Sequence, residues 1–156
     1  MARQGGSYAF LNDQLSTVDK AGLLRTVPLL SDISDDYLLA IARHGKDVRV
    51  NPGDVLVREG DAGNDLMLLL EGTAEVRKGG QSLNRMGAGD YFGEISLLDG
   101  QPRSADVVAT SPARVLILDH ASFDQVMASE PTLARKLVLN LCRMIRGGAA
   151  PEVAEA

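Results

Sequence analysis

Turn-forming residues recur through the middle of the chain and divide it into short apolar segments. Between residues 46 and 118, clusters of Gly, Pro, Asn and Asp separate the apolar runs at intervals of about 8 to 12 residues. The turns are Asn51-Pro52-Gly53-Asp54, Gly60-Asp61-Ala62-Gly63-Asn64, Glu71-Gly72, Gly79-Gly80, Gly87-Ala88-Gly89, Asp99-Gly100-Gln101-Pro102 and Ser111-Pro112. This spacing is typical of a small all-β sandwich or barrel. We therefore expect this region to form a jelly-roll β-barrel.

Two segments of this region predict which faces are buried. Residues 74–77 alternate apolar and charged side chains, so Ala74 and Val76 should face the interior while Glu75 and Arg77 face water. Residues 66–70 are apolar throughout, which predicts a strand covered on both faces.

Helical patterns flank the β region on both sides. Before it, an apolar cluster around Pro28 indicates short helical pieces, and Ser34 is a candidate N-cap for a helix that Gly45 ends. After it, Asp119 is a candidate N-cap for a short helix, and a longer helix begins near Pro131 and ends at residue 146. In the longer helix Leu133, Leu137, Leu141 and Ile145 recur every four residues, a stripe that suits core packing or a homodimer seam.

Length and charge limit the functional classes. A chain of 156 residues has room for one domain with a proper core. We expect a flexible tail over residues 1–22, the domain over 23–146 and a second tail over 147–156. The net charge of -5 argues against nucleic acid as a partner, because such binding needs clustered Lys and Arg. No apolar run is long enough for a signal peptide or a membrane span, and the single Cys142 fits a reducing compartment, so we expect a cytoplasmic protein.

Residues 89–105 combine the features of an anion site. Gly93 permits a tight turn into a short helix at about residues 94–98, whose first N–H groups and dipole favour a phosphate oxygen. Arg103 offers a fork of donors that matches two phosphate oxygens. Glu94 would repel a phosphate alone, but its carboxylate would accept a hydrogen bond from a sugar hydroxyl. The combination predicts a sugar phosphate as the ligand.

At this point the sequence resembles a known family. Phe92-Gly93-Glu94 followed by Pro102-Arg103-Ser104-Ala105 is similar to the phosphate-binding cassette of the cyclic nucleotide-binding domain family, which includes the catabolite activator protein and the regulatory subunits of protein kinase A. The resemblance implies that Gly93 and Glu94 hold the ribose and phosphate, that Arg103 binds the cyclic phosphate and that Ser104 adds a hydroxyl contact. It also implies a C-terminal lid that closes over the base.

The candidate residues come from the cassette, from the inward faces of neighbouring strands and from the end of the last helix. The ligand-binding candidates are Gly93, Glu94, Ile95, Ser96, Arg103, Ser104 and Ala105, with Val76 and Leu83 against the base, and the lid candidates are Arg143, Met144 and Arg146. In the family, Thr after the arginine often accompanies a preference for cyclic GMP, so Ser104 indicates cyclic AMP. The lid would be the helix from Pro131, hinged near residues 128–130. An unidentified protein would read its movement, and a homodimer through this helix is an open alternative.

Three functional classes remain to be separated. A metal enzyme on a cupin-like β-helix needs several converging ligands, which His44 and His120 do not supply, so we expect neither a metal nor catalysis. A regulatory domain that keeps the fold but binds no ligand would show a damaged cassette, whereas this one is intact. We therefore expect a stand-alone cyclic nucleotide receptor, with the excised sensor of a larger protein as the alternative.

Overall fold

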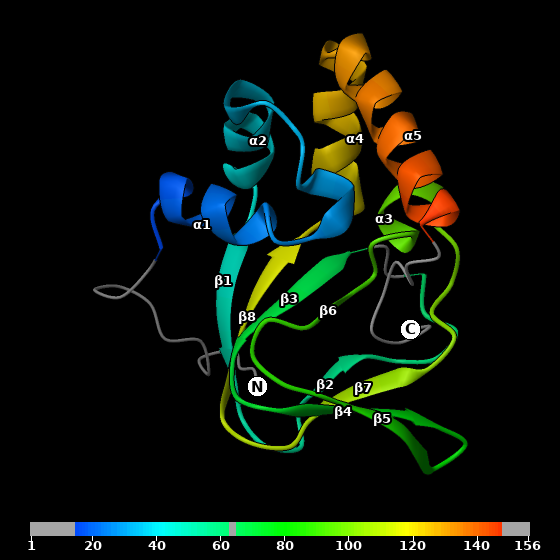
Figure 1. Cartoon of the computed structure of the whole chain (residues 1–156). Coiled ribbons are helices and arrows are strands. Elements are labelled where there is room, and N and C mark those ends of the chain that lie inside the picture. The colour runs from blue at the N-terminus through cyan, green and yellow to red at the C-terminus, as the bar shows by residue number, and fades with distance from the viewer. Residues whose placement is uncertain (1–14, 63–64, 148–156) are drawn as a thin grey trace.

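Two four-stranded antiparallel sheets pack against each other and carry helices at one end (Figure 1). The structure is a computed structural model that describes residues 15–62 and 65–147. The strands are β1 (Lys46–Val50), β2 (Val55–Val57), β3 (Leu66–Glu71), β4 (Ala74–Lys78), β5 (Gln81–Met86), β6 (Tyr91–Phe92), β7 (Asp106–Ala109) and β8 (Ala113–Leu118). The helices are α1 (Thr17–Leu24), the 3-10 helix η1 (Pro28–Leu30), α2 (Asp35–Ala42), α3 (Ser96–Asp99), α4 (His120–Ser129) and α5 (Pro131–Arg146).

The strand order confirms the predicted mainly β fold with flanking helices. One sheet has the order β1-β8-β3-β6 and the other the order β2-β7-β4-β5, so strands far apart in sequence become neighbours. Strand β8 lies between β1 and β3, with Leu68 opposite Leu116 in the β3–β8 register. The two sheets stay separate over the described residues, so the jelly roll is a sandwich here and not a closed barrel.

The apolar strand β3 separates two hydrophobic clusters. Leu66 and Leu68 belong to the cluster under the helices, whereas Met67 and Leu69 belong to the cluster between the sheets. Successive strand side chains point to opposite faces, so a strand with both faces covered must be apolar at every position. This confirms the prediction for residues 66–70.

Strand β4 shows the other predicted pattern. Ala74 and Val76 are each 1% exposed and lie in the core between the sheets. Glu75 and Arg77 point away from it and form an ion pair of 2.7 Å. The alternation predicted for this strand is confirmed.

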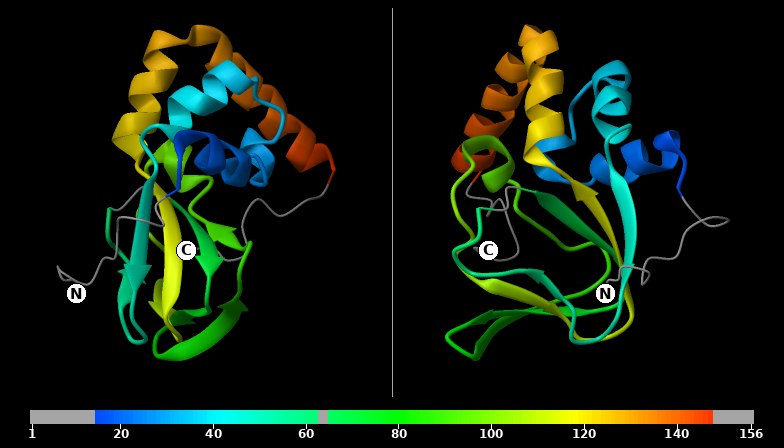
Figure 2. Two further views of the ribbon diagram at one scale, coloured as in Figure 1. Left: turned by 90° about the vertical axis from the view of Figure 1, so that its left-hand side faces the viewer. Right: turned by 180° about the vertical axis from the view of Figure 1, so that it is seen from behind.

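The helices gather over one end of the sandwich, with α1 and α2 on one side and α4 and α5 on the other (Figure 2). Ser16 caps α1 in a capping box with Asp19, which places the start of this helix inside the segment 1–22 that we expected to be a tail. Ala21 of α1 is buried in the helix-side cluster. The remaining tail residues, 1–14 and 148–156, lie outside the described residues.

The buried face of α5 differs from the predicted stripe. Leu133 and Leu137 are buried as expected, but Ile145 is 77% exposed, and Asn140 and Met144 take the buried positions instead. A residue advances an α-helix by about 100°, so a strict four-residue repeat drifts by about 40° at each step and leaves the packed face after three steps. Cys142, which is not part of the stripe, is exposed.

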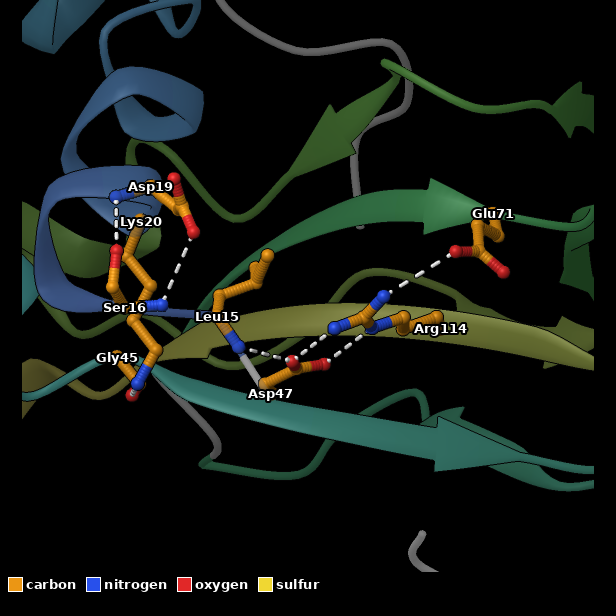
Figure 3. Close-up of polar contacts among 8 residues, drawn as sticks. All are labelled: Leu15, Ser16, Asp19, Lys20, Gly45, Asp47, Glu71 and Arg114. Carbon is orange, nitrogen blue, oxygen red and sulfur yellow. Dashed lines mark hydrogen bonds and ion pairs between the residues drawn. The ribbon is translucent and has the colours of Figure 1, made fainter. Parts of the chain in front are cut away.

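A nearly buried ion pair fastens β1 to β8 (Figure 3). Arg114 donates to both carboxylate oxygens of Asp47, at 2.8 and 2.6 Å, and the two side chains are 12% and 7% exposed. Asp47 also accepts a hydrogen bond from the Leu15 N–H, at 3.2 Å, and Lys20 of α1 reaches the Gly45 carbonyl at 2.8 Å. These contacts fix the N-terminal segment on the sheet.

Within residues 15–62 and 65–147, we find no helix that combines the length and the apolar character needed to cross a lipid bilayer.

Candidate functional site

The site is built around Gly93, directly after β6. Its φ of +89° lies in the left-handed region, and a Cβ at this position would overlap the main-chain oxygen of Asp65 and lie 2.7 Å from the Arg103 Nη1. Both the backbone conformation and the contacts therefore require glycine. The close packing brings the loop before β3 and the loop before β7 against the end of β6.

Glu94 follows the glycine and is fully buried. Its Oε2 accepts a hydrogen bond of 2.7 Å from the main-chain N–H of Leu29 in η1. A buried carboxyl group is costly unless it is hydrogen-bonded, so this contact from a distant segment holds the side chain in place.

The short helix predicted at about residues 94–98 is α3, shifted to Ser96–Asp99. The Leu97 N–H bonds the Gly93 carbonyl at 2.9 Å, and Gly100 ends the helix with a φ of +68°. The half-buried His120 at the start of α4 places its Nδ1 2.5 Å from the Leu97 carbonyl. The cassette helix is thereby tied to α4.

Arg103 is a buried cation next to Gly93. It is 2% exposed, its Nη2 donates to the main-chain oxygen of Asp65, and its guanidinium lies 5.6 Å from the centre of the Phe92 ring. Its own main chain is fixed as well, because its N–H bonds the Asp61 carbonyl at 3.0 Å and its carbonyl accepts from Gly60 at 2.8 Å. These contacts hold the fork in one orientation.

The neighbouring candidates divide between the core and the surface. Ala105 and Val76 are each 1% exposed and share the core between the sheets with Phe92. Ser96 is buried and Ile95 is half-buried, whereas Ser104 is exposed. Leu83 on β5 is 58% exposed and lies outside both hydrophobic clusters.

The three lid candidates on α5 differ in their surroundings. The Arg143 Nη1 lies 3.2 Å from the Asp32 Oδ2, which also accepts from Lys136 at 2.8 Å. Met144 packs in the helix-side cluster, and Arg146 is exposed. In this arrangement α5 is held against η1 and the segment that follows it.

The ionisable groups around the site differ in their surroundings. Burial raises the pKa of Asp65, and the nearby Arg103 charge opposes that increase. Hydrogen bonds from Lys136 and Arg143, with their positive charges, lower the pKa of Asp32 on the surface. The carboxylate beside the candidate site is therefore easier to protonate than an ordinary aspartate, while the one that holds α5 stays ionised.

Three residues of the site were not found by sequence reasoning. Asp65 and Leu29 take part through main-chain atoms, which leave no signature in the sequence. Asn140 donates to the Leu29 carbonyl at 2.9 Å, and its polar side chain on the apolar face of a helix was a signal that could have been read.

A separate groove of about 820 Å³ lies on the outer side of the sheet β2-β7-β4-β5. Glu75 and Arg77, which line it, pair with each other, and Asp106 accepts from the Glu59 N–H at 2.6 Å. Its lining includes neither Glu94 nor Arg103. Over the described residues we also find no group of three or more His, Cys, Asp or Glu side chains that could hold a metal ion.

Comparisons with known proteins find a matching family model and similar sequences. The family model for the cyclic nucleotide-binding domain matches residues 47–130. A cAMP-dependent protein kinase regulatory subunit of Hypocrea atroviridis is 34% identical over 113 residues, which cover 72% of this chain and 24% of the relative. The chain thus spans about a quarter of that relative's length.

Solved structures show the same fold. The N-terminal domain of a transcriptional regulator from Streptomyces coelicolor A3(2) aligns with a TM-score of 0.71 and 27% identity, over 81% of this chain and 92% of that one. The regulatory domain of Toxoplasma gondii PKA, crystallised with cAMP, aligns with a TM-score of 0.61 and 27% identity, over 77% of this chain and 48% of that one.

Proposed function

The chain belongs to the cyclic nucleotide-binding domain family, and we propose that it is a non-catalytic receptor module that binds cyclic AMP and signals by moving its C-terminal helices. One observation carries the proposal. Two buried charged side chains, Glu94 and Arg103, lie beside Gly93, where an added side chain would overlap its neighbours. A ribose hydroxyl and a phosphate joined in one small ring suit this pair of groups.

Each residue has a chemical role in the proposal. Arg103 would bind the cyclic phosphate, because its planar guanidinium matches two phosphate oxygens and its bond to the Asp65 carbonyl helps to fix the fork. Glu94 would accept the ribose 2′-hydroxyl. Gly93, Ile95 and Ser96 would offer main-chain N–H groups, and the Ser104 hydroxyl would add a bond to the phosphate.

The preference for cyclic AMP rests on Ser104, where a threonine would favour cyclic GMP. The similar Toxoplasma gondii domain was crystallised with cAMP, which agrees with this choice of ligand. We propose residues 23–146 as the binding domain. We place the protein in the cytoplasm, where its single exposed Cys142 would stay reduced.

Calorimetric titration of the purified chain tests the proposed function. We expect cyclic AMP to bind at one site per chain and more tightly than cyclic GMP, while 5′-AMP, which lacks the cyclic phosphate, serves as the control. Equal or tighter binding of cyclic GMP would contradict the preference. If neither cyclic nucleotide binds, the module is an interaction domain that keeps the fold alone.

The signal would leave the site through α5. The helix is separated from α4 at Glu130, whose φ of -133° and ψ of 78° interrupt the helical path, and Pro131 opens α5. Val76 and Leu83 would line the base, and Arg143, Met144 or Arg146 would cap it once α5 moves. Because Arg143 bonds Asp32 in this structure, Arg143 would have to break that bond before it could cap the base.

Amide hydrogen exchange tests this movement. We expect saturating cyclic AMP to slow exchange both in residues 93–105 and in α5, because a ligand shifts the lid only by binding one of its positions more tightly. The β4–β5 hairpin tip at Gly79 and Gly80 serves as the internal reference. Protection confined to residues 93–105 would show that α5 is no lid, although the binding site would stand.

A protein partner would bind α5 more tightly in one of its positions than in the other. Val138, Leu139 and Ile145 on this helix are 57%, 47% and 77% exposed, which leaves apolar surface for such a contact. A homodimer through the same surface is the alternative within this proposal. Analytical ultracentrifugation of the purified chain, with and without cyclic AMP, separates the two alternatives. Only a homodimer doubles the mass of the chain in the absence of another protein.

A further inference from the structure

The main chain of Leu29 joins the candidate ribose carboxylate to α5. Its N–H donates to the Glu94 Oε2 at 2.7 Å, and its carbonyl accepts from the Asn140 Nδ2 at 2.9 Å. Glu94 and Leu29 are fully buried and Asn140 is 2% exposed. Glu94 is 65 residues from Leu29 along the chain, and Asn140 is 111 residues from it. Leu29 therefore joins two distant segments to η1.

The local structure of η1 explains why Leu29 is available for both bonds. The first N–H groups and the last carbonyls of a helix have no partner within it. Pro28 has no N–H, so Leu29 carries the first free donor of the turn, and Glu94 satisfies it. Asn140 satisfies the carbonyl of the same residue. Two side chains from distant segments therefore hold this short turn.

We propose that Asn140 is a positioning residue for Glu94, and that the seating of α5 on Leu29 sets how strongly the site selects a ribose 2′-hydroxyl. This inference rests on the proposed function. A carboxylate can accept about four hydrogen bonds, so the Leu29 bond and a ribose bond can coexist on Glu94. Fixing the carboxylate in advance removes part of the ordering cost of binding. Asn140 fixes it through Leu29.

A second contact holds α5 beside the same turn from outside. Asp32, three residues after Leu29, accepts from both Lys136 and Arg143. Its side chain is 52% exposed, and exposed ion pairs contribute less than a buried hydrogen bond whose loss leaves a carbonyl unsatisfied. Asn140 should therefore have the larger influence on Glu94, and Asp32 a smaller one in the same direction.

The test compares cyclic AMP with its 2′-deoxy analogue in the full chain. We expect the parent to prefer cyclic AMP by about tenfold or more, the value of one hydrogen bond to a charged group. Asn140→Leu keeps the shape and removes the donor, and it should reduce the preference to within about threefold while affinity for the deoxy analogue stays within about twofold. Glu94→Ala, the reference, should abolish the preference.

Two further measurements keep the inference testable. Asp32→Ser changes a surface residue and should reduce the preference for cyclic AMP over the deoxy analogue by about twofold. This variant tests the inference if Asn140→Leu fails to fold. Without nucleotide, the Leu29 amide should exchange about tenfold faster in Asn140→Leu than in the parent, whereas Leu139→Ala, on the exposed side of α5, should leave it unchanged.

Each outcome separates the inference from the function beneath it. A parent chain that binds neither nucleotide overturns the proposed function, and the Leu29 exchange rate then decides the coupling by itself. A full preference in Asn140→Leu overturns the inference while the binding function stands. An equal loss for both nucleotides shows a purely structural role for Asn140 and overturns the inference as well.

Discussion

Replacing Arg103 with alanine is expected to weaken cyclic AMP binding by about ten- to a hundredfold. Charge-assisted hydrogen bonds contribute roughly 1.5–3 kcal/mol each, and a phosphate that loses this fork leaves its charge poorly compensated. Arg103→Lys should recover only part of the loss, because an ammonium group is a point charge and cannot bind two oxygens in one plane. Calorimetric titration of the three proteins measures the effect.

The control for this experiment is Arg85→Ala on β5. Arg85 is exposed, and its removal changes the net charge by the same amount as the removal of Arg103. Its affinity for cyclic AMP should match that of the parent. Thermal unfolding of Arg103→Ala must accompany the titration, because Arg103 also contacts Asp65 and Phe92. A folded Arg103→Ala protein with unchanged affinity would remove this residue from the site.

The part of the site that the sequence predicted is the part made of side chains with strong local requirements. Gly93 could be predicted because only glycine suits its turn, and Glu94 and Arg103 could be predicted because their charged groups suit a sugar hydroxyl and a phosphate. The distances between them along the chain matched a known cassette. Their structural partners, the main-chain groups of Asp65 and Leu29, could not be read, because every residue carries the same main chain.

The helices were predicted well in position and less well in orientation. The N-caps Ser34 and Asp119 begin α2 and α4 as expected, and for Asp119 the carboxylate accepts from the Ser122 N–H at 2.7 Å. The predicted buried face of α5 was wrong at its C-terminal end, because a four-residue repeat drifts around the helix axis. A 3.6-residue period would have selected Asn140 and Met144.

Residues far from the cassette depended on tertiary structure that the sequence did not specify. Leu83 was expected to touch the base from the inward face of a strand, but it is more than half exposed in the β4–β5 hairpin. The register of that hairpin shifts between Val76 and Arg77, and such an irregularity changes which side chains face inward. Its contact with the base stays a prediction.

Replacing Asp47 with alanine is expected to lower the free energy of unfolding by about 3 kcal/mol at pH 7. Removing one partner of a buried ion pair typically costs about 3–5 kcal/mol, because the other charge is left uncompensated. The lower end applies here, since Glu71 lies 3.4 Å from Arg114 and keeps a weak contact with it. Urea unfolding measures the change. Asp35→Ala, which removes an exposed pair with Arg25, is the control and should cost less than about 1 kcal/mol.

The effect of Asp47→Ala should depend on pH in a definite direction. Burial alone would raise the pKa of Asp47, but hydrogen bonds from Arg114 and from the Leu15 N–H outweigh it and lower the pKa below 3.8. A carboxylate with a lowered pKa in the folded state stabilises the protein above its unfolded pKa, and this stability is lost as the pH falls through the folded value. The difference in the free energy of unfolding between parent and variant should therefore be constant from about pH 5 to about pH 7. It should shrink below about pH 4, where Asp47 becomes protonated. A difference that grew on acidification would mean that Asp47 is not the ionised partner of Arg114.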